Sequence, residues 1–135
     1  MVIRKLNTYS LVLVFGIASA VLVQSCGKDG PDPGEIDFTL DLNDSKYSGL
    51  KNNGGIVYKN DIIIVKTSNG DYVALSQICT YALCTVTYDE ATNTFPCPCD
   101  NSRYTEDGNV LFGPAGKALF QYNTEIAGNY LRIIS

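Results

Sequence analysis

The chain has 135 residues, which is room for one domain, and its 45% apolar and 18% charged residues fit a folded protein rather than a disordered one. Its 14 acidic residues outnumber its 10 basic residues, which argues against a nucleic-acid partner. The sequence contains no histidine, which excludes hydrolases built on a histidine base and removes the commonest neutral metal ligand.

The first 25 residues have the pattern of an export signal. Two basic residues precede an apolar run, Leu11–Val23, that is shorter than the roughly 20 residues a membrane-spanning helix needs. The next segment, Val23-Gln24-Ser25-Cys26, resembles a bacterial lipobox, which implies cleavage before Cys26 and lipid attachment to it. We therefore expect a lipoprotein signal peptide over residues 1–25, with an ordinary signal peptide and a stray Cys26 thiol as the alternative.

Residues 26–35 are rich in glycine, proline and acidic side chains, which cannot bury apolar surface. We expect a flexible acidic tether that joins the membrane anchor to a folded domain over residues 36–135. This organisation places the protein in the bacterial cell envelope, lipid-anchored and facing the periplasm or the cell surface. Its partners are then the membrane, through the lipid, and an unidentified envelope protein.

From residue 36 onward the signals are of strands and turns. Apolar and polar residues alternate in several short segments, and an Asn69-Gly70 pair is a strong hairpin signal. No stretch shows a convincing helical period. We expect strands at residues 36–42, 56–58, 62–67, 72–75, 84–88, 94–96, 109–112, 117–123 and 129–134. Short strands with frequent turns predict an all-β sandwich or barrel-like fold.

Four of the five cysteines lie in two close pairs, Cys79 with Cys84 and Cys97 with Cys99. Such pairs are typical of a metal site or of a disulfide framework. The Cys-x-x-Cys knuckles of zinc sites are absent, although zinc or an all-cysteine cluster remains an alternative. A thiol–disulfide oxidoreductase is a further alternative, but the sequence offers no obvious group to lower a thiol pKa.

The two cysteine segments resemble the cluster-binding loops of the Rieske iron–sulfur family, Cys-x-His-x-x-Cys and Cys-Pro-Cys-His-x-Ser-x-Phe/Tyr. Here they read Cys79-Thr80-Tyr81-Ala82-Leu83-Cys84 and Cys97-Pro98-Cys99-Asp100-Asn101-Ser102-Arg103-Tyr104, with Gly108-Asn109-Val110 and Gly113-Pro114-Ala115 after them. The resemblance covers residues 36–134. It implies a Rieske-like fold of stacked antiparallel sheets with two apposed cysteine loops.

The resemblance also marks where this chain departs from the family. A Rieske cluster holds one iron by two cysteines and the other by two histidines. Cys79 and Cys97 match the cysteine ligands, whereas Tyr81 and Asp100 occupy the histidine positions. Asn101 stands where the family usually has glycine, so we expect the second loop to lose backbone freedom. Phenol and carboxylate are poor substitutes for imidazole, so we expect no metal at this site.

The family also implies a disulfide between the two loops, here Cys84–Cys99, which encloses about 15 residues and is worth ~3 kcal/mol. Without iron between them, Cys79 and Cys97 are predicted to form a second disulfide. The sequence thus predicts a Rieske-like lipoprotein with a degenerate cluster site, acting as a non-enzymatic, disulfide-stapled accessory or interaction module. The alternative is an electron-transfer protein that retains a [2Fe–2S] cluster on Cys79, Cys97, Tyr81 and Asp100.

Overall fold

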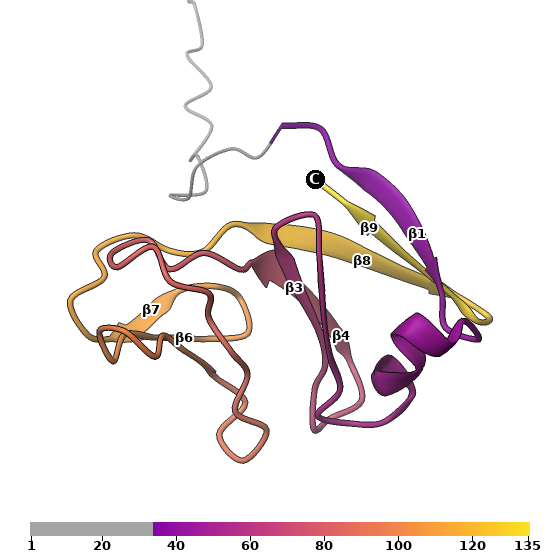
Figure 1. The fold of residues 1–135 in the computed structure, drawn as a ribbon, viewed down its shortest axis with the longest axis horizontal. Helices are drawn as coiled ribbons and strands as arrows, with labels where there is room; N and C mark the ends of the chain where they lie inside the picture. Colours follow the sequence, from indigo (N-terminus) through magenta and orange to yellow (C-terminus); the bar gives the residue numbers. More distant parts are fainter. Residues whose placement is uncertain (1–33) are drawn as a thin grey trace, which may run out of the picture.

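The computed structural model describes residues 34–135 and shows strands that pair only in antiparallel fashion in this range, as the sequence predicts (Figure 1). The predicted signal peptide, Cys26 and most of the predicted tether lie outside these residues. Among residues 34–135, no helix has the length and apolar character needed to cross a membrane.

Two sheets contain all the named strands of this range. A six-stranded sheet has the order β1-β9-β8-β4-β3-β2, and a three-stranded sheet has the order β5-β6-β7. The elements, in chain order, are β1 (Asp37–Asp41), the 3-10 helix η1 (Ser45–Lys51), β2 (Ile56–Lys59), β3 (Ile62–Lys66), β4 (Tyr72–Ser76), β5 (Phe95–Pro96), β6 (Arg103–Tyr104), β7 (Val110–Phe112), β8 (Gln121–Ala127) and β9 (Tyr130–Ile134).

Strand β3 is buried on both of its faces, because it lies inside the larger sheet between two hydrophobic cores. Successive side chains of a strand point to opposite faces. Ile63 and Val65 therefore enter one core, while Ile62 and Ile64 enter the other. This arrangement explains the unbroken β-branched run at residues 62–65, in which every residue is fully buried.

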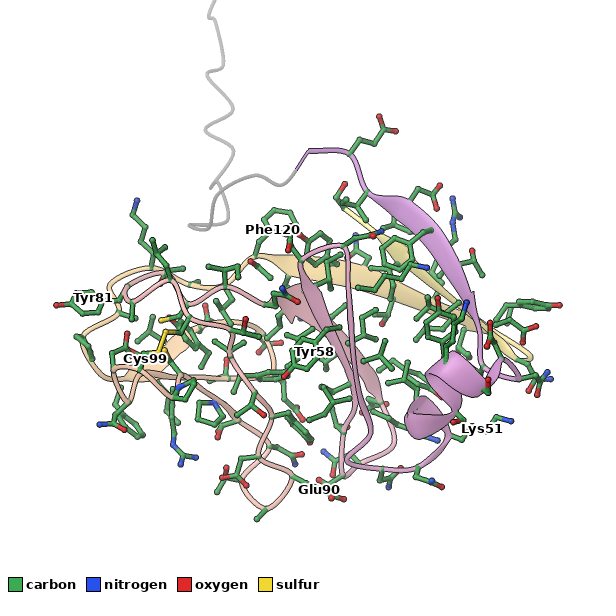
Figure 2. The ribbon with its side chains drawn as sticks, in the orientation of Figure 1. Lys51, Tyr58, Tyr81, Glu90, Cys99 and Phe120 are labelled. Carbon is green, nitrogen blue, oxygen red and sulfur yellow. A yellow bond between two sulfur atoms is a disulfide. The ribbon has the colours of Figure 1, made fainter. Side chains whose placement is uncertain are left out.

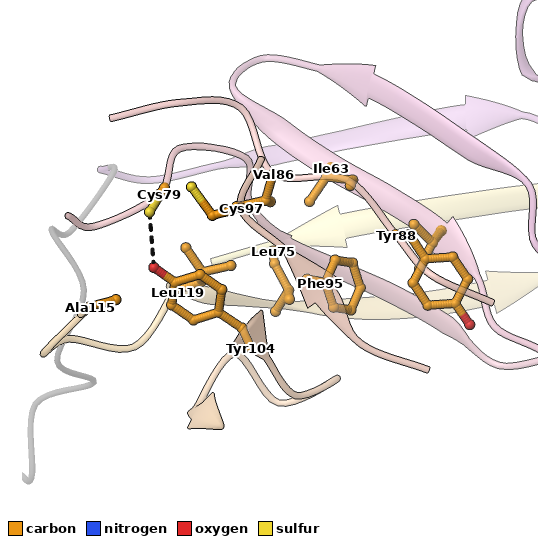
Figure 3. Close-up of a cluster of buried hydrophobic side chains, with 11 residues drawn as sticks. Ile63, Leu75, Cys79, Val86, Tyr88, Phe95, Cys97, Tyr104, Ala115 and Leu119 are labelled. Carbon is orange, nitrogen blue, oxygen red and sulfur yellow. Dashed lines mark hydrogen bonds between the residues drawn. The ribbon is translucent and has the colours of Figure 1, made fainter. Parts of the chain in front are cut away.

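The first of these cores supports the cysteine segments. Leu75 from β4, Phe95 from β5 and Leu119 pack together in it, and the Cys79 and Cys97 side chains belong to the same cluster (Figure 3). Strands β6 and β7 lie at the end of the molecule opposite η1 (Figure 1). The candidate site is thus carried by the end of the fold where the smaller sheet meets the larger one.

The structure differs from the sequence-based prediction at helix η1, which the sequence analysis did not anticipate. The Asp44 carboxylate caps the helix by accepting a hydrogen bond from the backbone N–H of Lys46 at 3.0 Å. Leu50 is its only buried residue. A helix this short, with one buried side chain, leaves no amphipathic period to detect.

The sequence predicts a strand at residues 84–88, but this segment makes one isolated bridge, Ile78↔Thr85, and a second bridge, Asp89↔Thr94, lies just beyond it. Successive backbone N–H groups bond to different segments of the chain: Val86 N–H donates to the Gln77 carbonyl, and Thr87 N–H donates to the Pro96 carbonyl. The segment therefore joins no continuous ladder.

Strand β8 was predicted over residues 117–123 but begins at Gln121. Leu119 instead donates a backbone hydrogen bond to Gly108 at 2.8 Å and buries its side chain beneath the cysteine segments. Because Leu119 bonds to the connection between β6 and β7 and not to a strand of the larger sheet, β8 begins only after it.

A leucine pair tests this account of the core. Leu75 is fully buried, so Leu75→Ala is expected to lower the free energy of unfolding by about 2–5 kcal/mol through lost burial and a residual cavity. Leu111 is 54% exposed on β7, and Leu111→Ala is expected to change it by only about 0.5 kcal/mol. Urea denaturation measures both, and equal losses would contradict the assigned core.

Candidate functional site

The two cysteine loops are closed on themselves by the same pair of backbone hydrogen bonds. In the first loop, which follows β4, Cys79 N–H donates to Cys84 and Leu83 N–H donates to Cys79. In the second loop, between β5 and β6, Cys97 N–H donates to Ser102 and Asn101 N–H donates to Cys97. Each loop is therefore a tight ring held by its own backbone hydrogen bonds, and corresponding residues of the two loops face each other.

Both rings need a left-handed residue at the same place. Leu83 has φ 58° and Asn101 has φ 61°. Asparagine enters this region far more readily than most residues. The second loop thus adopts the required conformation with asparagine at this position, and the expected loss of backbone freedom relative to glycine stays a prediction. Leu83 has no such advantage, and its side chain is 74% exposed.

A disulfide between Cys84 and Cys99 joins the two loops (Figure 2). It is the pairing that the family resemblance implies. Because it consumes two of the four thiols, a zinc site with four thiolates would require this bond to open. The remaining pair, Cys79 and Cys97, is buried and carries free thiols in the structure. The second disulfide expected from the sequence is therefore not formed here, and it stays a prediction.

The Cys79 and Cys97 sulfurs lie near each other beneath the loops, with the ring of Tyr104 below them (Figure 3). The Cys79 sulfur is 3.3 Å from the Tyr104 hydroxyl, which also lies 3.1 Å from the Thr80 hydroxyl. Burial, followed by the contact with Cys79, raises the pKa of Tyr104 to about 12. From the sequence, Tyr104 was recognised only as the last residue of the second loop motif. That position is the one sequence signal that points to a role for Tyr104 in the site.

Asp100 turns back toward the same sulfurs. One carboxylate oxygen accepts a hydrogen bond from the Ser102 backbone N–H at 2.7 Å, and the other accepts one from the Cys79 thiol at 3.3 Å. Burial acts to raise the pKa of Asp100, but hydrogen bonds from Ser102, Cys79 and Cys97 outweigh it and lower the pKa to about 2. Asp100 is thus an anion that accepts from both sides.

Burial also raises the pKa of the Cys97 thiol to about 11, and the neighbouring Cys79 thiol and Asp100 carboxylate add to this increase. A thiol with a raised pKa is a poor nucleophile near neutral pH, because the thiolate is the reactive form. This environment is the opposite of the one that a thiol–disulfide oxidoreductase needs.

Tyr81 does not join this group. Its side chain is 62% exposed and points away from the molecule at the outer end of the first loop (Figure 2). Of the four candidate cluster ligands, the structure brings together Cys79, Cys97 and Asp100, whose ligand atoms lie within 4.8 Å of one another.

This donor set does not fit the cluster that the family pattern implies. Two cysteines are in place for one iron, but neither imidazole is present for the other. Asp100 contacts a cysteine sulfur directly instead of standing apart from it, and Tyr81 lies at the surface. The residues that would hold the second iron are therefore not assembled as a pair.

A third segment supports the second loop from behind. The Ser102 hydroxyl accepts a hydrogen bond from the Ala115 backbone N–H at 3.0 Å, and both residues are buried. Gly113 has φ 108°, and a Cβ atom there would stand 2.5 Å from the Ser102 Cα. Position 113 of the Gly-Pro-Ala segment therefore requires glycine, because its backbone has a positive φ and lies too close to Ser102 for a side chain.

A surface cavity of about 420 Å³ opens beside the second loop. Its lining includes Cys97, Arg103 and Phe112, and the Arg103 guanidinium lies 5.9 Å from the Phe112 ring centre. The cavity therefore opens to solvent beside the segment that carries Cys97. The cavity could not be predicted from the sequence, because its lining combines the cysteine loop with Phe112 from another strand.

Comparison with known proteins agrees with this fold. The family model of the Rieske [2Fe-2S] domain matches residues 40–123. The cytochrome b6-f complex iron-sulfur subunit of Chlorobaculum tepidum is 35% identical over 98 residues, covering 71% of this chain and 54% of that protein. The menaquinol:cytochrome c reductase iron-sulfur subunit of Geobacillus thermodenitrificans is 32% identical over 99 residues, covering 70% and 54%.

Among solved structures, the ferredoxin of carbazole 1,9a-dioxygenase from Nocardioides aromaticivorans IC177 aligns with a TM-score of 0.55. It is 16% identical, and the match covers 63% of this chain and 90% of that protein, which shows a shared fold. The chain spans about half the length of the curated relatives it matches.

The inter-loop disulfide can be tested by removing both of its cysteines. Replacing Cys84 and Cys99 together by serine is expected to lower the free energy of unfolding by about 3 kcal/mol, the value for a loop of this length. Urea denaturation with and without reductant checks it. Reductant should weaken the parent protein, and it should leave the double variant unchanged when Cys79 and Cys97 are free thiols, as they are in the structure. Peptide mapping that found Cys84 bonded to Cys97 would contradict the pairing.

Proposed function

Because this chain belongs to the Rieske [2Fe-2S] domain family, we propose that it uses the family's fold without the family's standard cluster. In this proposal it is a non-enzymatic accessory or interaction module of the bacterial cell envelope. The single observation that carries the proposal is the state of the two histidine positions. Asp100 bonds to the Cys79 thiol, and Tyr81 is directed into solvent.

The anchoring of this module is part of the same proposal. Residues 1–25 serve as a lipoprotein signal peptide, Cys26 carries the lipid, and residues 26–35 tether the β domain of residues 36–135. The pattern of the sequence supports this organisation.

The identified relatives bear on the choice of partner. Two of them are iron-sulfur subunits, one of a cytochrome b6-f complex and one of a menaquinol:cytochrome c reductase. By analogy we propose that this chain acts beside an envelope protein complex rather than alone. The acidic net charge of −4 gives no support to a nucleic-acid partner.

A second candidate function is supported by the free thiols. Cys79 and Cys97 match the family's cysteine ligands and are unpaired and close together in the structure. A protein that held a [2Fe–2S] cluster on these two residues, with Tyr81 and Asp100 completing the set, would be an electron carrier. Such a cluster would supply one-electron redox chemistry.

Iron and thiol analysis of the purified protein separates the two functions. We expect a colourless protein with far less than one iron per chain, because the donors for a second iron are not assembled. Thiol titration after unfolding without reductant then reports the Cys79–Cys97 pair: two thiols if it is open, as in the structure, and none if it is bridged. Stoichiometric iron and inorganic sulfide with visible absorption would establish the electron carrier instead.

Metabolic labelling with a radioactive fatty acid tests the anchor. The parent protein should incorporate label and partition with membranes, because acylation of the cysteine after the lipobox-like segment supplies several buried chains. Cys26→Ala should lose the label, whereas Ser25→Ala, which keeps a small residue before the cysteine, should retain it. Label that survives Cys26→Ala would refute lipidation at that residue.

A further inference from the structure

Three potential metal ligands converge where the two cysteine loops meet. The Cys79 sulfur, the Cys97 sulfur and one Asp100 oxygen lie within 4.8 Å of one another. Ligand atoms around a tetrahedral zinc ion stand about 3.8 Å apart at a zinc–sulfur distance of about 2.3 Å. The three donors therefore need only small side-chain movements to surround a single ion.

We propose that Cys79, Cys97 and Asp100 bind one divalent transition-metal ion of the zinc class. This inference rests on one part of the proposed function, namely that no standard two-iron cluster occupies the loops. Two thiolates and one carboxylate suit zinc, whereas magnesium and calcium prefer oxygen ligands alone. The two thiol protons leave to solvent as the ion binds.

The geometry favours one ion over a two-iron cluster. In a two-iron cluster of this family, two cysteines bind one iron and two histidines bind the other. The ligands of the second iron are therefore separated from the two cysteines by the cluster itself. Here the Asp100 oxygen is only 3.3 Å from the Cys79 sulfur, on the same side as the thiols. Tyr81, the other donor that a second iron would need, is 62% exposed.

Neighbouring groups hold the three ligands in position. The backbone N–H of Ser102 fixes one Asp100 oxygen at 2.7 Å and directs the other toward Cys79. The Tyr104 hydroxyl stands 3.3 Å from the Cys79 sulfur. Oriented outer groups of this kind are what metal ligands usually have, and their loss typically weakens metal binding about 10–100-fold.

A cavity that opens to solvent reaches one of the three ligand residues. Cys97 is almost fully buried, yet it contributes to the lining of the cavity of about 420 Å³ that opens to solvent. Three protein ligands leave one position of a tetrahedral ion for water or a small molecule.

Cobalt(II) provides the test, because it replaces zinc and its thiolate complexes absorb light. The full chain, mildly reduced and freed of reductant, is titrated with Co²⁺ and then with Zn²⁺. We expect one Co²⁺ per chain with thiolate charge-transfer absorption, displaced by zinc. Cys79→Ser and Cys97→Ser should abolish the absorption, and Asp100→Asn should weaken binding at least about 10-fold.

Two substitutions serve as controls. Asp107→Asn removes an exposed carboxylate outside the ligand group and should leave the affinity unchanged. Tyr81→Phe should also leave it unchanged, whereas a cluster with Tyr81 as ligand would be lost. X-ray absorption of the zinc-loaded parent protein should show two sulfur neighbours and an oxygen shell, independently of whether any variant folds.

The outcomes separate this inference from the proposed function. Absence of Co²⁺ binding by protein with two titrated thiols overturns the metal site and leaves the cluster-free module standing. Binding that survives Cys79→Ser, or four sulfur neighbours, also overturns it, since the metal would then use other ligands. Iron and inorganic sulfide in the protein as purified would overturn both.

Discussion

The covalent bond between Cys84 and Cys99 is the constraint on which the cysteine end of this molecule depends. One loop follows β4 of the larger sheet, and the other connects two strands of the smaller sheet. Each loop is closed by its own backbone hydrogen bonds, which fix its internal shape but not its position relative to the other loop. The disulfide joins the loops covalently, and together with the hydrogen bond between Cys79 and Asp100 it holds Cys79 and Cys97 close to each other on a core that both sheets build.

The aspartate at a histidine position changes what these loops do with their buried thiols. A neutral imidazole has one acceptor nitrogen, whereas an ionised carboxylate accepts hydrogen bonds through both oxygens. Asp100 uses one oxygen to hold the Ser102 backbone and the other to hold the Cys79 thiol. A residue that in the family's pattern would stand apart from the cysteines as a ligand for the second iron is here part of a compact group with them.

Several parts of the fold could be read from the residues alone. The alternation at residues 36–42 and the Asn69-Gly70 turn locate β1 and the β3–β4 hairpin, because period-two burial and left-handed turn residues are local requirements. Helix η1 was not predicted, because only Leu50 is buried in it and a single buried residue gives no periodic signal. Residues 84–88 looked like a strand because alternation reports burial on one side and not whether a continuous partner strand exists.

By itself, the sequence determined the strand-and-turn character of the chain, the resemblance of its two cysteine segments to a cluster-binding family, and the absence of the histidines that such a cluster needs. These are properties of residue type and order. Only the tertiary structure decided which candidate donors meet. It places Asp100 against Cys79, leaves Tyr81 at the surface and brings the Tyr104 hydroxyl beneath the thiols. The physical reason is that side-chain direction at a loop position follows from the backbone conformation and packing of the whole loop, including the left-handed turn at Asn101.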